Sequence, residues 1–206
     1  IFGNVHDGGT ASKVVIRVKY SQSPSVTSAT LPHKQGGFAA SKKAIAANDT
    51  FELLISARLG GLNDEFEKKF LLALNAWLHL GALGLRATRG GGNFSWDDQP
   101  RTPEAYRQAI ASFKLKSAFL DEVFPNAEAA RKVITDTLGD RAFGGSAPLG
   151  KIAGGRKTSP LRFRIVKFFD NDFRIIAVWD GRTAVTGNSD RDLKEAVQTL
   201  KHNGKR

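Results

Sequence analysis

The residues of this chain best suited to chemistry are two arginines next to a run of glycines. Arg86 and Arg89 lead into glycines 90–92, and Asn93 follows. Because glycines leave the backbone bare, their N–H groups can approach an anion while guanidinium groups hold it from the side. No Gly-Lys-Ser/Thr follows, and the segment stands between an expected helix and an expected strand, which excludes a Walker loop and a dinucleotide fingerprint. The pattern predicts a cradle for RNA phosphates; the alternative is a simple connection whose arginines bind nothing.

A second basic stretch lies later in the chain. Residues 141–160 carry four cations and no acid: Arg141, Lys151, Arg156 and Lys157. They lead into an expected strand at 161–168, in which Arg162 and Arg164 alternate with apolar residues. We expect this strand to be basic on one face and apolar on the other, and to extend the RNA contact. Charges that protect a solvated edge strand are the alternative.

Candidates for catalysis are few. His6 stands beside Asp7, and His33 lies in a long loop, so either could serve a general acid–base ribonuclease. No spacing links two histidines, and no His, Asp or Glu cluster has the spacing of metal ligands. The absence of cysteine excludes thiol nucleophiles and Cys-ligated zinc. We therefore expect no catalytic residue, metal or cofactor.

Composition favours a polyanionic partner. The chain has 206 residues, with 31 Lys and Arg against 20 Asp and Glu, a net charge of +11. Clustered cations bind nucleic acids by releasing the counterions condensed on phosphates. A hydrophobic content of 41% is enough for a core, and no apolar run is long enough for a membrane span. We expect a soluble, cytoplasmic protein with no membrane contact. Its start at Ile1 suggests a piece of a longer chain with sequence missing upstream.

The first half of the chain reads as strands followed by a helix. Strands are expected at 14–20 and 51–59, separated by a long loop over 21–48. Asn63 is expected to cap a long helix with one apolar stripe, which ends near His79, expected to be a C-terminal cap. A short strand should begin near Asn93, where Phe94 and Trp96 either stack on bases or are buried.

The second half reads as three helices, a hairpin and a last helix. The three helices are expected after a Thr102 cap, over 117–123, and over 126–138 with an Asn126 cap. A turn at 170–172 should join the strands 161–168 and 173–179, and Ser189 and Asp190 should cap the last helix. The linker 97–102 separates two expected domains, 1–98 and 99–206. The expected class is therefore α+β with antiparallel sheets.

Several passages resemble the RAMP proteins of type III CRISPR effector complexes. IFG at 1–3 and ASKVVIRV at 11–18 are similar to the family's FGS…SKVRIRV passage. GALGLRATRGGG at 81–92 is similar to its glycine-rich loop, GGLGxRxRRGxG, and SPLRF at 159–163 is similar to its SPL strand. Order and spacing are most similar to the first-numbered RAMP subunit of the Cmr (type III-B) complex. Glycines 90–92 depart from the family's Arg-Gly-Phe-Gly.

The resemblance implies ferredoxin-like (RRM-like) modules with antiparallel sheets packed by helices. Residues 1–98 would be the C-terminal part of a first module with the glycine-rich loop, and 99–206 a second module. The implied function is non-catalytic RNA binding, with CRISPR RNA, target RNA and other RAMP subunits as partners. The alternatives are a RAMP-type endoribonuclease that uses His6 or His33, and a ribosome- or tRNA-associated basic protein. The expected RNA-binding residues are Lys13, Arg17, Arg86, Arg89, Gly90, Gly91, Gly92, Asn93, Lys151, Arg156, Lys157 and Arg162.

Overall fold

A computed structural model describes residues 11–20, 25–29, 41–58, 63–84, 87–137, 159–183 and 190–203. The chain divides into two compact units, the first formed by Ile1–Ser28 and Ser41–Asn75, the second by Ala29–Ala40 and Ala76–Arg206. Each unit combines helix with antiparallel strands, which confirms the expected α+β class.

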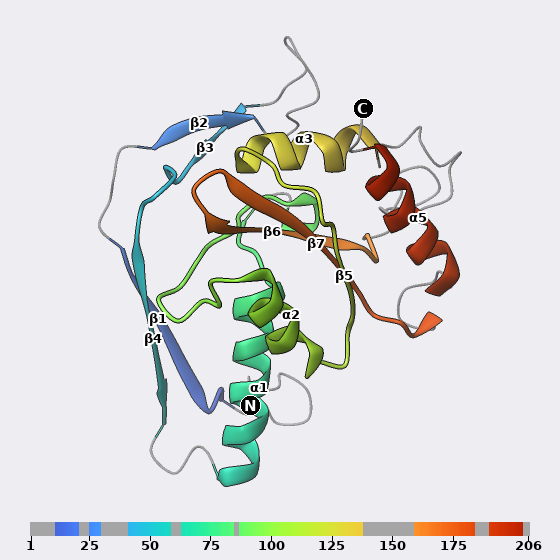
Figure 1. Ribbon diagram of the computed structural model, residues 1–206. Helices are drawn as coiled ribbons and strands as arrows, with labels where there is room; N and C mark the ends of the chain where they lie inside the picture. The colour runs from blue at the N-terminus through green and yellow to red at the C-terminus, as the bar shows by residue number, and fades with distance from the viewer. Residues whose placement is uncertain are drawn as a thin grey trace, which may run out of the picture. The chain divides into compact units, whose positions relative to one another are not determined.

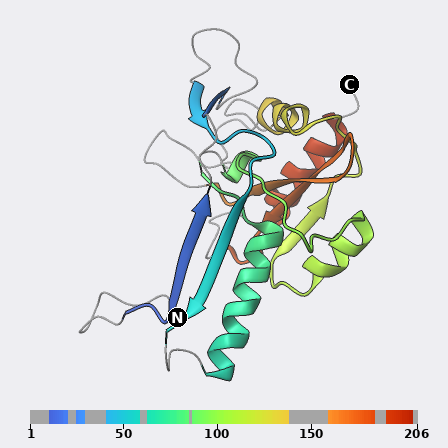
Figure 2. The ribbon, with the colours of Figure 1, turned by 90° about the vertical axis from the view of Figure 1, so that its left-hand side faces the viewer.

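The first unit is built on a long antiparallel strand pair. Strand β1 (Val14–Tyr20) pairs with β4 (Phe51–Ala57), with Ile16 opposite Ile55 (Figure 2). Both strands were predicted, since β-branched and aromatic residues are concentrated in them. The expected loop over 21–48 is wrong in part, because β2 (Val26–Ala29) and β3 (Ser41–Ala44) form a second two-stranded sheet within it.

Helix α1 (Asp64–Leu80) begins at the predicted cap and continues into the second unit. The Asn63 side-chain oxygen accepts a hydrogen bond from the Phe66 N–H at 2.9 Å. Asp64, Glu65 and Glu67 in the first turn place negative charge at the positive end of the helix dipole. The cap and the acidic turn together account for where the helix begins.

The described residues of the second unit form a three-stranded antiparallel sheet (Figure 1). Its strands are β5 (Lys116–Phe119), β7 (Asp172–Trp179) and β6 (Arg162–Phe169), in that spatial order. β5 corrects the helix predicted over 117–123. The segment is short, and pairing with β7, which sets Lys116 opposite Trp179 and Phe119 opposite Ile176, outweighs its helical pattern.

One face of this sheet packs against α3 (Ala127–Thr137) and α5 (Asp190–Asn203). Phe163 and Ile165 of β6 share this core with Ile134 of α3. The predicted inward positions of α5 are confirmed, since Leu193, Val197 and Leu200 are at most 3% exposed. The Asn126 cap of α3 is confirmed by a 2.8 Å hydrogen bond from the Ala129 N–H, whereas Ser189 lies outside the described residues.

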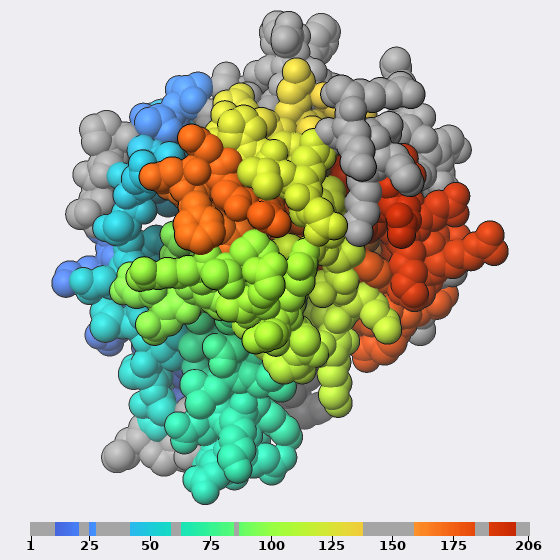
Figure 3. Space-filling model, viewed as in Figure 1, coloured from blue at the N-terminus to red at the C-terminus, as the bar shows by residue number. Residues whose placement is uncertain are grey.

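The opposite face is covered by α2 (Pro103–Ala111), which begins at the predicted Thr102 cap. Tyr106 and Ile110 of α2 pack there against Val166 and Phe168 of β6. Figure 3 shows side chains of α2 (green) lying directly beside those of the β6–β7 hairpin (orange). With helices on both faces, the sheet of this unit has its strands largely buried.

The prediction of a basic face on residues 161–168 is therefore wrong. Arg162 and Lys167 are exposed, but Arg164 is 1% exposed and lies on the α2 side of the sheet, opposite Ile176. The physical reason is that α2 supplies a second apolar layer, so the alternate residues of β6 face a core rather than water. No helix in the part of the chain that the structure describes is long and apolar enough to cross a membrane.

Candidate nucleic-acid interface

The structure describes eight of the twelve predicted RNA-binding residues. Lys13 and Arg17 belong to the first unit, and Arg89, Asn93, Arg162 and the three glycines to the second. Outside the described residues lie Arg86, Lys151, Arg156 and Lys157, and also the candidate catalytic residues His6 and His33. Within the second unit, residues 87–93 lie against β6, the strand that begins with Arg162.

The glycine-rich segment is a packed structure. A single 3-10 turn, η1 (Ala87–Arg89), leads into Gly90 and Gly92, whose φ angles are 69° and 66°. A Cβ on Gly90 would lie 3.0 Å from the Cδ1 atoms of Ile134 and Ile165, and one on Gly92 would lie 1.6 Å from the Leu83 carbonyl oxygen. Positive φ and close packing therefore explain both glycines without any bound anion.

Asn93 ties this segment to the edge of β6. Its Nδ2 donates to the Gly90 carbonyl oxygen at 2.8 Å, and its Oδ1 accepts from the Ile165 N–H at 2.9 Å. The strand predicted near Asn93 is absent from the described residues, because this side chain satisfies an edge group of β6 in place of a neighbouring strand. The Leu83 N–H also donates to the Gly92 carbonyl oxygen at 2.8 Å, which closes the segment on itself.

Arg164, expected on the basic face of its strand, is instead buried and holds the two ends of the segment. The Arg164 guanidinium donates from Nη1 to the Gly81 carbonyl oxygen and from Nη2 to the Phe94 carbonyl oxygen. It also lies over the Phe94 ring, 4.5 Å from the centroid. Burial lowers the pKa of Arg164, and nearby Tyr106 acts in the opposite direction. One signal could have revealed this burial: apolar residues at both 165 and 166 indicate a strand covered on both faces.

The aromatic residues beside the segment are internal contacts. The ring centroids of Phe94 and Trp77 are 4.7 Å apart, and Trp96 packs 4.8 Å from His79. His79 lies at the end of α1 as predicted, but its ring is buried among Trp96, Tyr106 and Phe113. Phe94 and Trp96 are both half-buried, and these contacts favour packing within the protein over base stacking.

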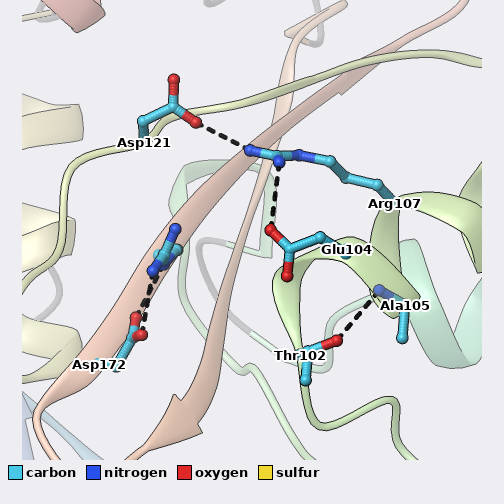
Figure 4. A network of polar contacts seen from close by, with 7 residues as sticks. Thr102, Glu104, Ala105, Arg107, Asp121 and Asp172 are labelled. Atoms are coloured by element: carbon cyan, nitrogen blue, oxygen red, sulfur yellow. Dashed lines mark hydrogen bonds and ion pairs between the residues drawn. The ribbon is translucent and has the colours of Figure 1, made fainter.

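A polar network fixes the start of α2 and the β6–β7 hairpin (Figure 4). Arg107 pairs with Asp121 at 2.8 Å and lies 3.8 Å from a Glu104 oxygen. Arg174 contacts both oxygens of Asp172, at 2.9 and 3.1 Å, and this pairing raises its pKa. The acids are thus matched with guanidinium groups, and no cluster of three or more His, Asp or Glu side chains suited to a metal ion occurs in the described ranges.

The cations of the first unit lie on and beside β1. Arg17 is exposed on the sheet face that also carries Lys19, whose Nζ pairs with Glu52 at 3.3 Å. The Lys13 Nζ lies over the Phe66 ring, 4.4 Å from its centroid. Their chemistry suits phosphates. Because they belong to the first unit and residues 87–93 to the second, we treat the two as distinct candidate surfaces.

Comparison of the chain with protein-family models and with curated proteins finds no match. Chemically, the second unit offers a basic connection whose backbone is held at both ends by one guanidinium and in its middle by an amide side chain. Arg89, at the end of η1, is the described cation of this connection, and a backbone held in this way can present it to a polyanion at a fixed position.

Proposed function

We propose that this chain is a cytoplasmic, non-catalytic RNA-binding subunit of a type III CRISPR RNA-guided interference complex. Its partners would be CRISPR RNA, target RNA and other RAMP subunits. The observation that carries the binding role is the arginine-bearing, glycine-rich segment, which is built onto β6 through Arg164 and Asn93. In a chain of net charge +11, a fixed basic segment of this kind suits the phosphates of RNA.

The topology of the second unit supports the proposed ferredoxin-like modules. β5 and β6 are both antiparallel to the β7 strand between them, so they run in the same direction, and α3 connects them. Helices α3 and α5 cover the same face of the sheet. The order β5-α3-β6-β7-α5 corresponds to the first five elements of a β-α-β-β-α-β module, in which a sixth element would pair with β5.

The proposed contact surface differs from that of a typical RRM, where bases stack on aromatic residues of an open sheet face. In this chain α2 covers that face, and the aromatic residues of the sheet there, Phe119 and Phe168, are buried beneath it. We therefore place the RNA contact on the glycine-rich segment, with Arg86 and Arg89 binding phosphates and Arg162 extending the surface. A phosphate contact of this kind positions an RNA strand without selecting its sequence.

Titration of the protein with labelled single-stranded RNA tests the proposal. Arg86→Ala with Arg89→Ala should weaken binding to unrelated sequences by similar factors. It should also flatten the slope of log affinity against log salt by roughly 1.4, since each phosphate contact with a single strand contributes about 0.7. Binding that is unchanged in this variant, or lost for some sequences only, would contradict the phosphate cradle. Shortened RNA, abolished by His6→Ala or His33→Ala, would favour the endoribonuclease alternative.

A further inference from the structure

Arg164 occupies a position where an apolar side chain would be expected. Its cross-strand partner is Ile176, and Val166 and Phe168 lie further along the same face of β6. A charged group at 1% exposure loses its hydration, which is costly unless the protein supplies equivalent partners. A core that needed only packing would be better served by leucine or methionine. The presence of arginine therefore calls for an explanation in terms of what the guanidinium contacts.

The guanidinium contacts the two ends of one segment. Gly81 directly follows α1, and Phe94 follows the last glycine and Asn93, so the two carbonyl groups bracket the glycine-rich run. The Tyr106 side chain also interacts with Arg164, and the buried Nε of Arg164 has no hydrogen-bond partner among the described residues. Both Nη atoms of the guanidinium thus donate to these two carbonyl groups.

The chemistry of the side chain suits this arrangement. A guanidinium presents its N–H donors in a rigid planar fork, so it can reach two acceptors at once, whereas an ammonium on a flexible stem acts as a point charge. Its flat face also lies over the Phe94 ring, which fixes the same end of the segment a second time. Lysine in this position would keep the charge but lose the simultaneous hold on both ends.

We propose that Arg164 is the positioning residue of the RNA-binding segment. It acts by holding Gly81 and Phe94 together, so that residues 87–93, with Arg89 among them, meet phosphates in a fixed arrangement. This inference rests on the proposed function. Arg164 itself touches no RNA, because it is buried. Its effect on affinity comes from ordering the segment before binding, which removes part of the conformational cost of association.

A double-mutant cycle tests this role in the full chain. Arg164→Met keeps the volume and removes both hydrogen bonds, and the reporter is the factor by which Arg86→Ala with Arg89→Ala weakens binding of a labelled single-stranded RNA. We expect Arg164→Met to lower affinity about tenfold, on the scale of ordering two long side chains. In the Arg164→Met background, Arg86→Ala with Arg89→Ala should then cause little further loss of RNA affinity. The slope of log affinity against log salt for Arg164→Met should be as flat as for Arg86→Ala with Arg89→Ala alone.

Arg174→Met is the matched control. Arg174 lies in the same sheet, its side chain is 20% exposed and it is paired with Asp172, so its loss also destabilises the unit. If a residue has only a structural role, its substitution in a protein that still folds should not change the affinity loss caused by Arg86→Ala with Arg89→Ala. We therefore expect the full reporter effect in Arg174→Met. Circular dichroism at the titration temperature shows that each variant is folded.

The outcomes separate the two proposals. Wild-type protein whose RNA binding does not depend on Arg86 and Arg89 overturns the phosphate cradle and this inference with it. A full reporter effect in Arg164→Met leaves the cradle standing and overturns the positioning role alone. If Arg164→Met does not fold, Arg164→Lys carries the same test, because it retains the charge and most of the packing but can hold only one end of the segment.

Discussion

The Tyr106 hydroxyl donates a 2.6 Å hydrogen bond to the His79 carbonyl oxygen, and so joins α2 to the end of α1. Tyr106 is completely buried, and its ring packs edge-on against those of His79, Phe119 and Phe168. One side chain thereby connects the helix that precedes the glycine-rich segment with the helix that covers the sheet. The contact also satisfies one of the last carbonyl groups of α1, which have no partner within the helix.

Tyr106→Phe tests how much this hydrogen bond contributes. The variant retains the packing of the ring but removes a buried hydrogen bond to the His79 carbonyl oxygen, so we expect the free energy of unfolding to fall by ~1–2 kcal/mol. Chemical denaturation followed by circular dichroism measures the change. Tyr20→Phe is the control, since the Tyr20 hydroxyl pairs with Asp49 in a partly exposed site and should contribute less. Equal losses in the two variants would contradict the importance of burial at Tyr106.

Stability should decline at alkaline pH because of the same tyrosine. Burial raises the pKa of Tyr106 above its ordinary value of 10.0, although nearby Arg164 acts in the opposite direction. The unfolded chain therefore releases this proton first, so the contribution of Tyr106 is intact below pH 10.0 and is lost as the pH rises through the folded-state pKa. Denaturation at a series of alkaline pH values should show this decline in the wild type and a smaller one in Tyr106→Phe. Parallel curves would contradict the assignment.

The elements that the sequence predicts correctly are those set by local chemistry. The Asn63, Thr102 and Asn126 caps, and the hairpin turn with Asn171 at a φ of 63°, each depend on neighbouring residues only. β5 was missed because its four residues are strand only through their pairing with β7, a contact remote in the sequence. Local patterns carry little information about such pairings.

The sequence alone indicates which segment to consider as a candidate site, but not the contacts that hold it in place. The glycines and arginines of 86–92 indicate a candidate segment. The need for Gly90 and Gly92, however, depends on Ile134, Ile165 and Leu83, which only the fold brings near. Arg164 was misjudged because a basic residue in an alternating strand usually marks the solvent face. Whether the twelve predicted residues bind RNA remains a prediction.

Asn93 should stabilise the glycine-rich segment through both ends of its amide. Asn93→Asp keeps an acceptor for the Ile165 N–H but loses the donor to Gly90, where two oxygens would then face each other. We expect a loss of ~1–3 kcal/mol, measured by chemical denaturation. Gln99→Glu is the matched control, since the Gln99 amide donates to the Lys167 carbonyl oxygen at an exposed position and its loss should cost less. A larger loss at Gln99 would contradict the role assigned to Asn93.

Alanine substitutions at three glycines with similar backbone angles distinguish the cost of backbone strain from the cost of steric overlap. Gly84, Gly90 and Gly92 have φ angles of 73°, 69° and 66°, so alanine at any of them is strained by ~1–2 kcal/mol. A Cβ on Gly84 meets nothing within 4 Å, one on Gly90 meets two flexible isoleucine side chains at 3.0 Å, and one on Gly92 meets backbone at 1.6 Å. We therefore expect the loss in unfolding free energy to increase from Gly84→Ala through Gly90→Ala to Gly92→Ala.

The largest of these losses should reach about 3 kcal/mol or more, because strain and overpacking add at Gly92. Thermal and chemical denaturation of the three variants give the order directly, and Gly84→Ala supplies the cost of the backbone angle alone. Equal losses at all three positions would show that the angle decides and that the segment does not pack as closely as its contacts with Leu83 and Ile165 require. A loss confined to Gly90 and Gly92 would instead locate the whole effect in packing, since the shared φ would then cost nothing measurable.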